Sequence, residues 1–263
     1  MGPPAMAVDL GSRRAEAAAR QILSGFGLGR LARLDLRDLA YARGLLVEER
    51  RVDGAEGRMM RGRRHGIAVV DARIQQPGRK RFIIAHELGH FELHHDEPVF
   101  VCDSAAFFDW HRGRPAETEA NRFAAELLMP RAAFQEDAGA IRPSMDTIDD
   151  LAGAYGVTPT AAAFRFVDLD IAPSALVFCQ HGQIVWTLLS KDFPFRYIRR
   201  KQEPHGHSGA GEFFASGTTS DDAIPTPLHA WFLDDDLPRD GRCFEQCRVM
   251  PALNATLSLL WMD

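Results

Sequence analysis

The chain has 263 residues, a formal net charge of −5 and a hydrophobic content of 46%. This length allows one large domain or two modest domains with an ordinary apolar core. The acidic balance argues against broad, nonspecific binding to nucleic acid, which needs a basic surface.

The chain holds no apolar stretch of about eighteen residues, so we expect no membrane span. Its N-terminal residues lack the basic and apolar regions of a secretory signal. The expected location is therefore the cytoplasm. There the four cysteines are expected to be reduced core residues without a function: Cys102, Cys179, Cys243 and Cys247.

Short helices and strands are predicted before residue 75. Apolar residues at helical spacing indicate a helix over 12–25 and a second one around 36–42. Three apolar or alternating stretches follow, at 45–52, 58–61 and 65–70, and they predict a small antiparallel sheet. The strongest of them, HGIAVVDA, is expected at a sheet edge beside a cleft, where a peptide could bind by adding a strand.

The stretch RFIIAHELGHFELHH, residues 81–95, contains an HExxH arrangement at His86-Glu87-Leu88-Gly89-His90. On a helix, His86 and His90 project from one face, one turn apart, as two ligands of a single zinc ion require. Glu87 follows at about 100° around the helix, so it can act as a general base on a metal-bound water. The apolar neighbours predict that this helix is buried, where polar side chains need partners.

A third zinc ligand is expected from a later buried helix over Glu117–Met129, which ends before Pro130. Glu117 lies at the edge of its apolar stripe and is the preferred ligand. Asn121, one turn on, could hydrogen-bond a ligand and hold it in orientation. Glu119 points elsewhere and is the lesser candidate.

Asp96 is a rival third ligand, because it lies ten residues after His86, the spacing of the pattern HExxHxxGxxH. That pattern needs a glycine for a sharp turn, and Leu93 stands at this position. A chain that stays helical would carry Asp96 away, and would place His94 and His95 on the surface. Residues 96–115 are expected to form a long loop whose aromatic side chains pack beneath it or line a substrate groove.

The segment 144–169 has the pattern of a helix-turn-helix, IDDLAGAYGV followed by TPTAAAFRFVDL. Its second helix offers DNA only Arg165, and the segment has four aspartates, so a scaffold or docking role is preferred. Residues 170–263 are predicted to form a mixed α/β domain with a hairpin at its start and the strand ATLSLLWM at its end. The region 205–228 is expected to be loose, with His205 and His207 as flexible surface histidines.

HELGH, followed after a gap by ETEANRFAAELLMP, resembles the ImmA/IrrE family of metallopeptidases, over roughly residues 30–168. The resemblance implies a gluzincin-like zinc site with His86, His90 and Glu117 as ligands and Glu87 as the catalytic glutamate. It also implies a regulatory protease that cleaves helix-turn-helix transcriptional repressors and so induces stress-response or mobile-element genes. Some relatives carry a GAF-like domain, which suggests that residues 170–263 sense a ligand or simply stabilise the peptidase.

The predicted fold class is α+β. Three parts are expected: a zinc metallopeptidase domain over 1–143, the helix-turn-helix-like segment over 144–169, and a C-terminal α/β domain over 170–263. Zn²⁺ is the expected cofactor, with Mn²⁺ or Fe²⁺ as substitutes. The expected partner is a protein substrate, a helix-turn-helix repressor; direct DNA binding and membrane association are not expected.

Two questions stay open at this point. Tyr155 or Arg122 could donate a hydrogen bond to the oxyanion, and the sequence does not choose between them. The alternative function is a non-catalytic regulator that grips a repressor or DNA without cutting. The intact Glu87 argues against this alternative, because a pure binding protein has no need of a general base.

Overall fold

The structure, a computed structural model, describes residues 5–29, 34–103, 114–139, 142–198, 200–234 and 236–262. The aromatic residues of the predicted loop, Phe107, Phe108 and Trp110, lie outside these ranges. The chain divides into two compact units, Met1–Phe134 with Gly153–Thr158, and Gln135–Ala152 with Pro159–Asp263. Among the described residues no helix has both the length and the apolar character that crossing a bilayer requires.

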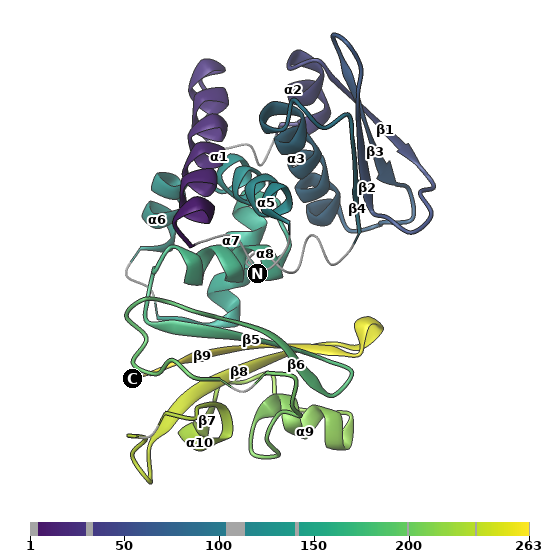
Figure 1. The fold of residues 1–263 in the computed structure, drawn as a ribbon. Coiled ribbons are helices and arrows are strands. Elements are labelled where there is room, and N and C mark those ends of the chain that lie inside the picture. Colours follow the sequence, from purple (N-terminus) through teal and green to yellow (C-terminus); the bar gives the residue numbers. More distant parts are fainter. Residues whose placement is uncertain are drawn as a thin grey trace. The chain divides into compact units, whose positions relative to one another are not determined.

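The first unit contains a four-stranded sheet in the order β1-β3-β2-β4 (Figure 1). Its strands are β1 (Leu45–Arg50), β2 (Gly57–Arg61), β3 (Gly66–Asp71) and β4 (Val99–Cys102). Strand β2 pairs antiparallel with β3 and with β4, whereas β1 runs parallel to β3. The prediction of a purely antiparallel sheet was therefore wrong, and the sheet is mixed.

The predicted edge position of HGIAVVDA was also wrong, because β3 lies between β1 and β2. Its last four residues, Ala68–Asp71, are all buried, as in a strand that is covered on both faces. Such a strand gains most from a central position. The edge next to β2 is formed by β4, which lies inside the predicted loop and is too short for its alternation to be recognised.

Helices cover the first unit's sheet and each other. They are α1 (Ala5–Gly25), α2 (Leu36–Ala42), α3 (Pro77–Leu93), α5 (Pro115–Leu128) and the start of α6 (Arg131–Ala138). Helix α3 packs on β2 and β3, and α5 packs against both α1 and α3. A Cβ atom on Gly89 would lie 3.2 Å from Cα of Ala120, so this glycine permits the close approach of α3 and α5.

The second unit is built on a five-stranded antiparallel sheet in the order β6-β5-β9-β8-β7. Its strands are β5 (Ser174–Gln180), β6 (Gln183–Leu189), β7 (Ile224–Pro227), β8 (Arg242–Met250) and β9 (Ala255–Trp261). Helix α8 (Pro159–Asp168) packs on β5 and β6. An ion pair between Asp149 and Arg248 joins α7 (Met145–Tyr155) to β8. Helices α9 (Gly209–Ser216) and α10 (Leu228–Trp231) contribute to the core beneath this sheet.

The region 205–228, predicted to be loose, contains α9 and β7. The Ser208 side chain caps α9 by accepting from the backbone N–H of Gly211, and Gly217 ends the helix in the left-handed conformation. A serine before and a glycine after a short apolar run was the signal that could have predicted this helix. Strand β8, RCFEQCRVM, was missed as well, although its burial alternates.

Candidate metal centre

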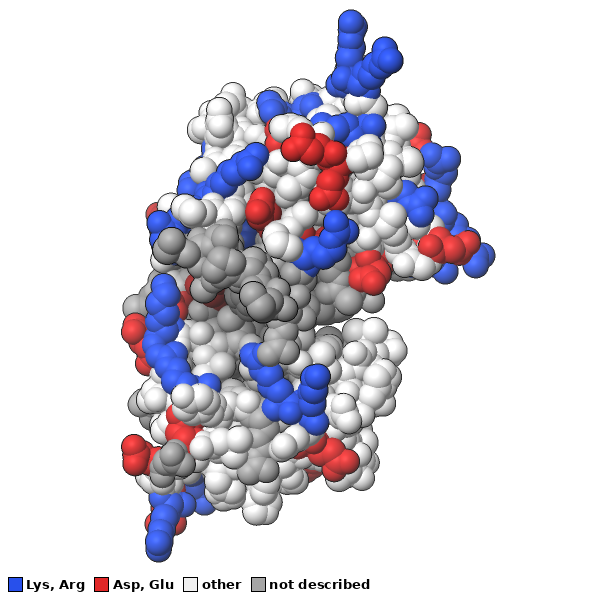
Figure 2. All heavy atoms as spheres, viewed as in Figure 1, with Lys and Arg blue, Asp and Glu red and all other residues white. Residues whose placement is uncertain are grey.

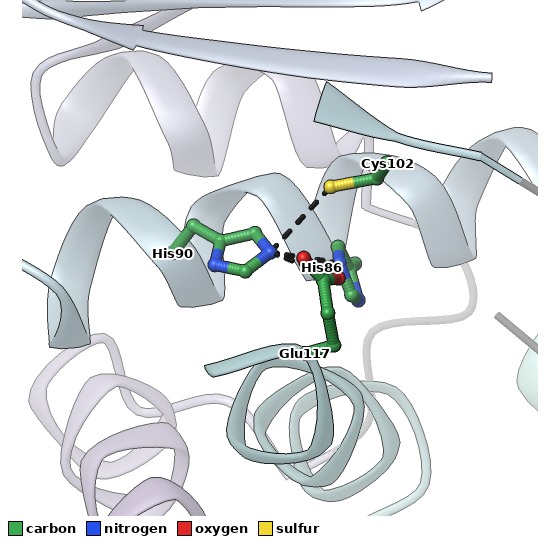
Figure 3. Close-up of side chains that lie close together, drawn as sticks. All are labelled: His86, His90, Cys102 and Glu117. Carbon is green, nitrogen blue, oxygen red and sulfur yellow. Dashed lines mark hydrogen bonds and ion pairs between the residues drawn. The ribbon is translucent and has the colours of Figure 1, made fainter. Parts of the chain in front are cut away.

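Four side chains that can bind a metal converge in the first unit (Figure 3). Helix α3 supplies His86 and His90, α5 supplies Glu117, and strand β4 supplies Cys102. All four residues are buried, and their ligand atoms lie within 4.8 Å of one another. The structure thus brings together the three predicted ligands and one residue to which sequence analysis had assigned no function.

The distances between these atoms suit a small tetrahedral ion. Nε2 of His90 lies 3.0 Å from Nε2 of His86 and 3.4 Å from Oε2 of Glu117, and Nε2 of His86 lies 3.1 Å from the same oxygen. Nitrogen and oxygen ligands about 2.0–2.2 Å from a tetrahedral zinc ion lie about 3.3–3.5 Å from one another. The three donors are therefore spaced within a few tenths of an ångström of the separation that zinc requires.

Asn121 orients the first histidine. Its Oδ1 lies 2.8 Å from Nδ1 of His86, and Asn121 is fully buried. An amide oxygen only accepts, so Nδ1 carries the proton and Nε2 keeps its lone pair toward Glu117 and His90. This is the arrangement in which a histidine binds a metal through Nε2 while its other nitrogen is held by a neighbour.

The second histidine is held by a chain of two residues that was not predicted. Nδ1 of His90 lies 3.0 Å from Nδ1 of His94, whose Nε2 lies 3.3 Å from Oε2 of Glu119. An ionised Glu119 accepts from His94, which in turn accepts from Nδ1–H of His90, so Nε2 of His90 also keeps its lone pair. The expectation that His94 lies on the surface was wrong, because only 13% of its side chain is exposed.

Glu87 is fully buried, and among the described residues its carboxylate oxygens meet no N–H or O–H donor; the thiol of Cys102 is a neighbouring weak donor. Burial raises its pKa well above the usual range; the neighbouring Cys102 thiol opposes this rise, and the charge of Glu117 adds to it. Leaving a buried carboxylate without a partner is costly. A water molecule beside the donors of His86, His90 and Glu117 is the partner that this position calls for.

The protonation states of the donors also favour a cation. Burial lowers the pKa of His90 to about 3, against the opposing effect of Glu117, so its imidazole is neutral at pH 7. Two nitrogen lone pairs and a carboxylate oxygen facing one another repel unless a positive charge lies between them. The donor set therefore fits a divalent metal ion.

Cys102 reaches the centre because the buried side chains of β4 alternate. The ring of Phe100 stacks on the ring of His90, with centroids 3.9 Å apart, and two residues later the sulfur of Cys102 lies 3.5 Å from Nε2 of His90. Burial and the nearby carboxylates of Glu87 and Glu117 raise the pKa of this thiol. The position of Cys102 depends on strand pairing, so its spacing in the sequence carries no signal for it.

The remaining candidates lie elsewhere. Asp96 is exposed, as is His95, and α3 ends at Leu93 rather than continuing through these residues. Tyr155, one of the two candidates for donating to the oxyanion, is fully buried beside Phe134. Which residue donates to the oxyanion stays a prediction. In the second unit, His205 and His207 are exposed, as expected, and their rings lie beside the exposed His229 of α10.

Comparison with known proteins finds a match over the part of the chain that holds these residues. Residues 40–167 match the IrrE N-terminal-like domain of the M78 peptidases. The radiation response metalloprotease IrrE of Deinococcus radiodurans is 25% identical over 119 residues, which are 45% of this chain and 36% of that protein. Residues 40–167 of this chain are therefore similar to the peptidase domain of the ImmA/IrrE family. The resemblance predicted from HELGH and ETEANRFAAELLMP is thereby confirmed.

The match to the D. radiodurans protein spans only about a third of that protein's length, so the activity of that protein does not transfer with the family. A solved structure, a Mycobacterium tuberculosis transcriptional regulator, is similar in fold along most of both chains. Its TM-score is 0.58 with 17% identity, and the match covers 94% of this chain and 87% of that one. This protein therefore shares its fold with that regulator along most of the chain, including the second unit.

Proposed function

We propose that this protein is a zinc-dependent endopeptidase of the gluzincin type. The observation that carries the proposal is Glu87, a fully buried carboxylate without a described partner next to three converging metal donors. A protein that only binds metal has no use for such a group, because burying it lowers stability. A general base for water needs this position.

His86, His90 and Glu117 would hold the zinc ion, with Mn²⁺ or Fe²⁺ as substitutes. Such an ion polarises a water molecule and the scissile carbonyl. Glu87 accepts the proton of the attacking water and then delivers it to the leaving nitrogen.

Strand β4 offers a place for an extended peptide. It is the edge strand next to β2 in the described sheet, and its outward side chains Val99 and Val101 are half exposed. A substrate that adds to this edge gains main-chain hydrogen bonds and runs along the strand that ends at the metal centre. This role was expected for HGIAVVDA, whose central place in the sheet leaves it no free edge.

The proposed substrate is a helix-turn-helix transcriptional repressor, and its cleavage would induce stress-response or mobile-element genes. This proposal rests on the family; the name of the D. radiodurans relative links that protein to a radiation response. The second unit, residues 170–263 above all, would sense a ligand in the manner of a GAF-like domain or stabilise the peptidase.

Direct DNA binding through 144–169 has little support. Arg165, the basic residue of α8, is fully buried and lies 3.8 Å from Asp168. On the face shown in Figure 2, Lys and Arg side chains are interspersed with Asp and Glu. Phosphate contacts need exposed basic side chains that act together. A role of this segment in docking the repressor fits its charge better.

The test is incubation of the purified protein with candidate helix-turn-helix repressors, followed by mass measurement of the fragments. We expect one or a few defined cuts by the wild type, and none by Glu87→Gln or after removal of metal with a chelator. A repressor that binds the zinc-loaded protein tightly and is never cut would instead establish the non-catalytic regulator.

A further inference from the structure

We propose that the sulfur of Cys102 is a fourth protein ligand of the metal, and that it must leave the ion before a peptide can be cleaved. The inference rests on the proposed metal centre and adds a ligand and a form of regulation to it. The HExxH pattern assigns no role to this cysteine.

The distance of Cys102 from its neighbour matches a shared tetrahedral ion. Its Sγ lies 3.5 Å from Nε2 of His90. With Zn–S at about 2.3 Å and Zn–N at about 2.0–2.1 Å, tetrahedral geometry places sulfur and nitrogen about 3.6 Å apart. Figure 3 shows Cys102 approaching the donors from β4, opposite the helix that carries Glu117. The sulfur therefore lies within reach of the same ion, since all four ligand atoms lie within 4.8 Å of one another.

The surroundings of Cys102 hold it there. Phe100 stacks on the His90 ring and fixes the register of β4 against α3. Gly57 of β2 pairs with Cys102 across the sheet, and a Cβ atom on Gly57 would collide with Oε1 of Glu87. The glycine thus leaves room for the carboxylate beneath the strand pair. Cys102 is fully buried, so its sulfur has little freedom to turn away without movement of β4.

Four protein ligands close a zinc site, whereas a catalytic site keeps one position for water. With Cys102 bound, Glu87 has no water to activate, and the peptidase is latent. Opening is a ligand exchange: the metal–sulfur bond breaks, a water oxygen takes the position, and the released thiolate takes a proton from solvent. No electron is transferred. The strand that would receive the substrate is β4 itself, so a peptide adding to its edge acts on the element that carries the sulfur.

X-ray absorption at the zinc edge of the wild-type protein tests the ligand without any substitution. We expect one sulfur at about 2.3 Å together with nitrogen and oxygen ligands at about 2.0–2.2 Å. The second measurement is the absorption spectrum of protein loaded with Co²⁺ alone. Thiolate ligation adds an intense charge-transfer band in the near ultraviolet. Cys102→Ser should lose this band and still bind one Co²⁺ per chain.

Cys179→Ser is the matched control, because Cys179 is equally buried but lies in the second unit's sheet. It should keep the band. Cys102→Ala serves as a second variant, and circular dichroism establishes that each variant is folded. The inference is overturned by a zinc-edge spectrum that shows no sulfur ligand, or by a charge-transfer band of Co²⁺ that persists in both Cys102 variants.

The outcome is distinguishable from failure of the proposed function. A sulfur ligand in a protein that cuts no repressor leaves the fourth ligand established and removes the peptidase. Cleavage of a repressor by a protein whose zinc-edge spectrum shows no sulfur ligand would establish the peptidase and remove the fourth ligand. If both hold, folded Cys102→Ala should cleave at least as fast as the wild type at equal metal content, and slower cleavage would rule out latency.

Discussion

Replacing Glu87 with Gln should abolish peptide cleavage and at the same time stabilise the metal-free protein. The substitution keeps the size of the side chain and removes a charge that has no hydrogen-bond partner among the described residues. Loss of a general base lowers the rate by about 10²–10⁴-fold. Metal binding should persist, because His86, His90 and Glu117 are unchanged.

The gain in stability can be bounded. A glutamate has a pKa of about 4.3 in the unfolded chain, and each pKa unit corresponds to about 1.4 kcal/mol. At pH 7 the buried group can escape its charge by taking up a proton, at a cost of about 4 kcal/mol, which is the upper limit of the destabilisation. The glutamine amide is also a buried polar group, and its own desolvation reduces the gain. We therefore expect metal-free Glu87→Gln to gain up to about 4 kcal/mol.

The sign of the pH dependence follows from the raised pKa of Glu87. Below the unfolded pKa the carboxyl is protonated in both states, and the penalty vanishes. It grows as the pH rises toward the folded pKa and is then constant. The stability advantage of Glu87→Gln should consequently be small near pH 4 and largest at neutral pH.

The assay is urea denaturation of both metal-free proteins by circular dichroism, from pH 4 to pH 7.5, beside the repressor cleavage assay. Glu92→Gln is the control, since Glu92 lies on the same helix in a surface ion pair with Arg43. It should change stability by less than about 1 kcal/mol. A Glu87→Gln protein that is less stable than the wild type at pH 7, or that cleaves at an undiminished rate, would refute the reasoning.

Three further predictions concern the support of the centre and the second unit. Asn121→Ala should lower zinc affinity by about 10–100-fold in a chelator competition, and Glu117→Ala should lower it by more. Equal affinities in both variants would contradict the assignment of Glu117 as a ligand and of Asn121 as the residue that orients His86. Gly57→Ala should reduce cleavage without loss of metal, since the added Cβ displaces Glu87; full activity would show that the carboxylate has room to move. The indole N–H of Trp231 donates to the Glu245 carboxylate, and an amide NH₂ in place of that oxygen would face it as a second donor. Glu245→Gln should therefore lower the free energy of unfolding in urea by about 1–3 kcal/mol. Unchanged stability would exclude that contact as a source of the second unit's stability.

Local spacing in the sequence was enough for the features of the centre that lie within one helix. The helical period places His86 and His90 on one face with Glu87 beside them, and the same period places Glu117 and Asn121 one turn apart on α5. Pro115 and Pro130 mark where α5 begins and where it has ended. Because these relations involve a few residues of regular backbone, they needed no knowledge of the fold.

Features that depend on pairing between distant segments could not be predicted in this way. The parallel alignment of β1 with β3 depends on which strand takes the centre of the sheet. The chain from His90 through His94 to Glu119 forms only once α5 packs on α3. Cys102 enters the ligand set because β4 pairs with β2 and faces α3. Periodicity within the HExxH helix thus determined two ligands and a base, whereas long-range packing decided what surrounds and completes them.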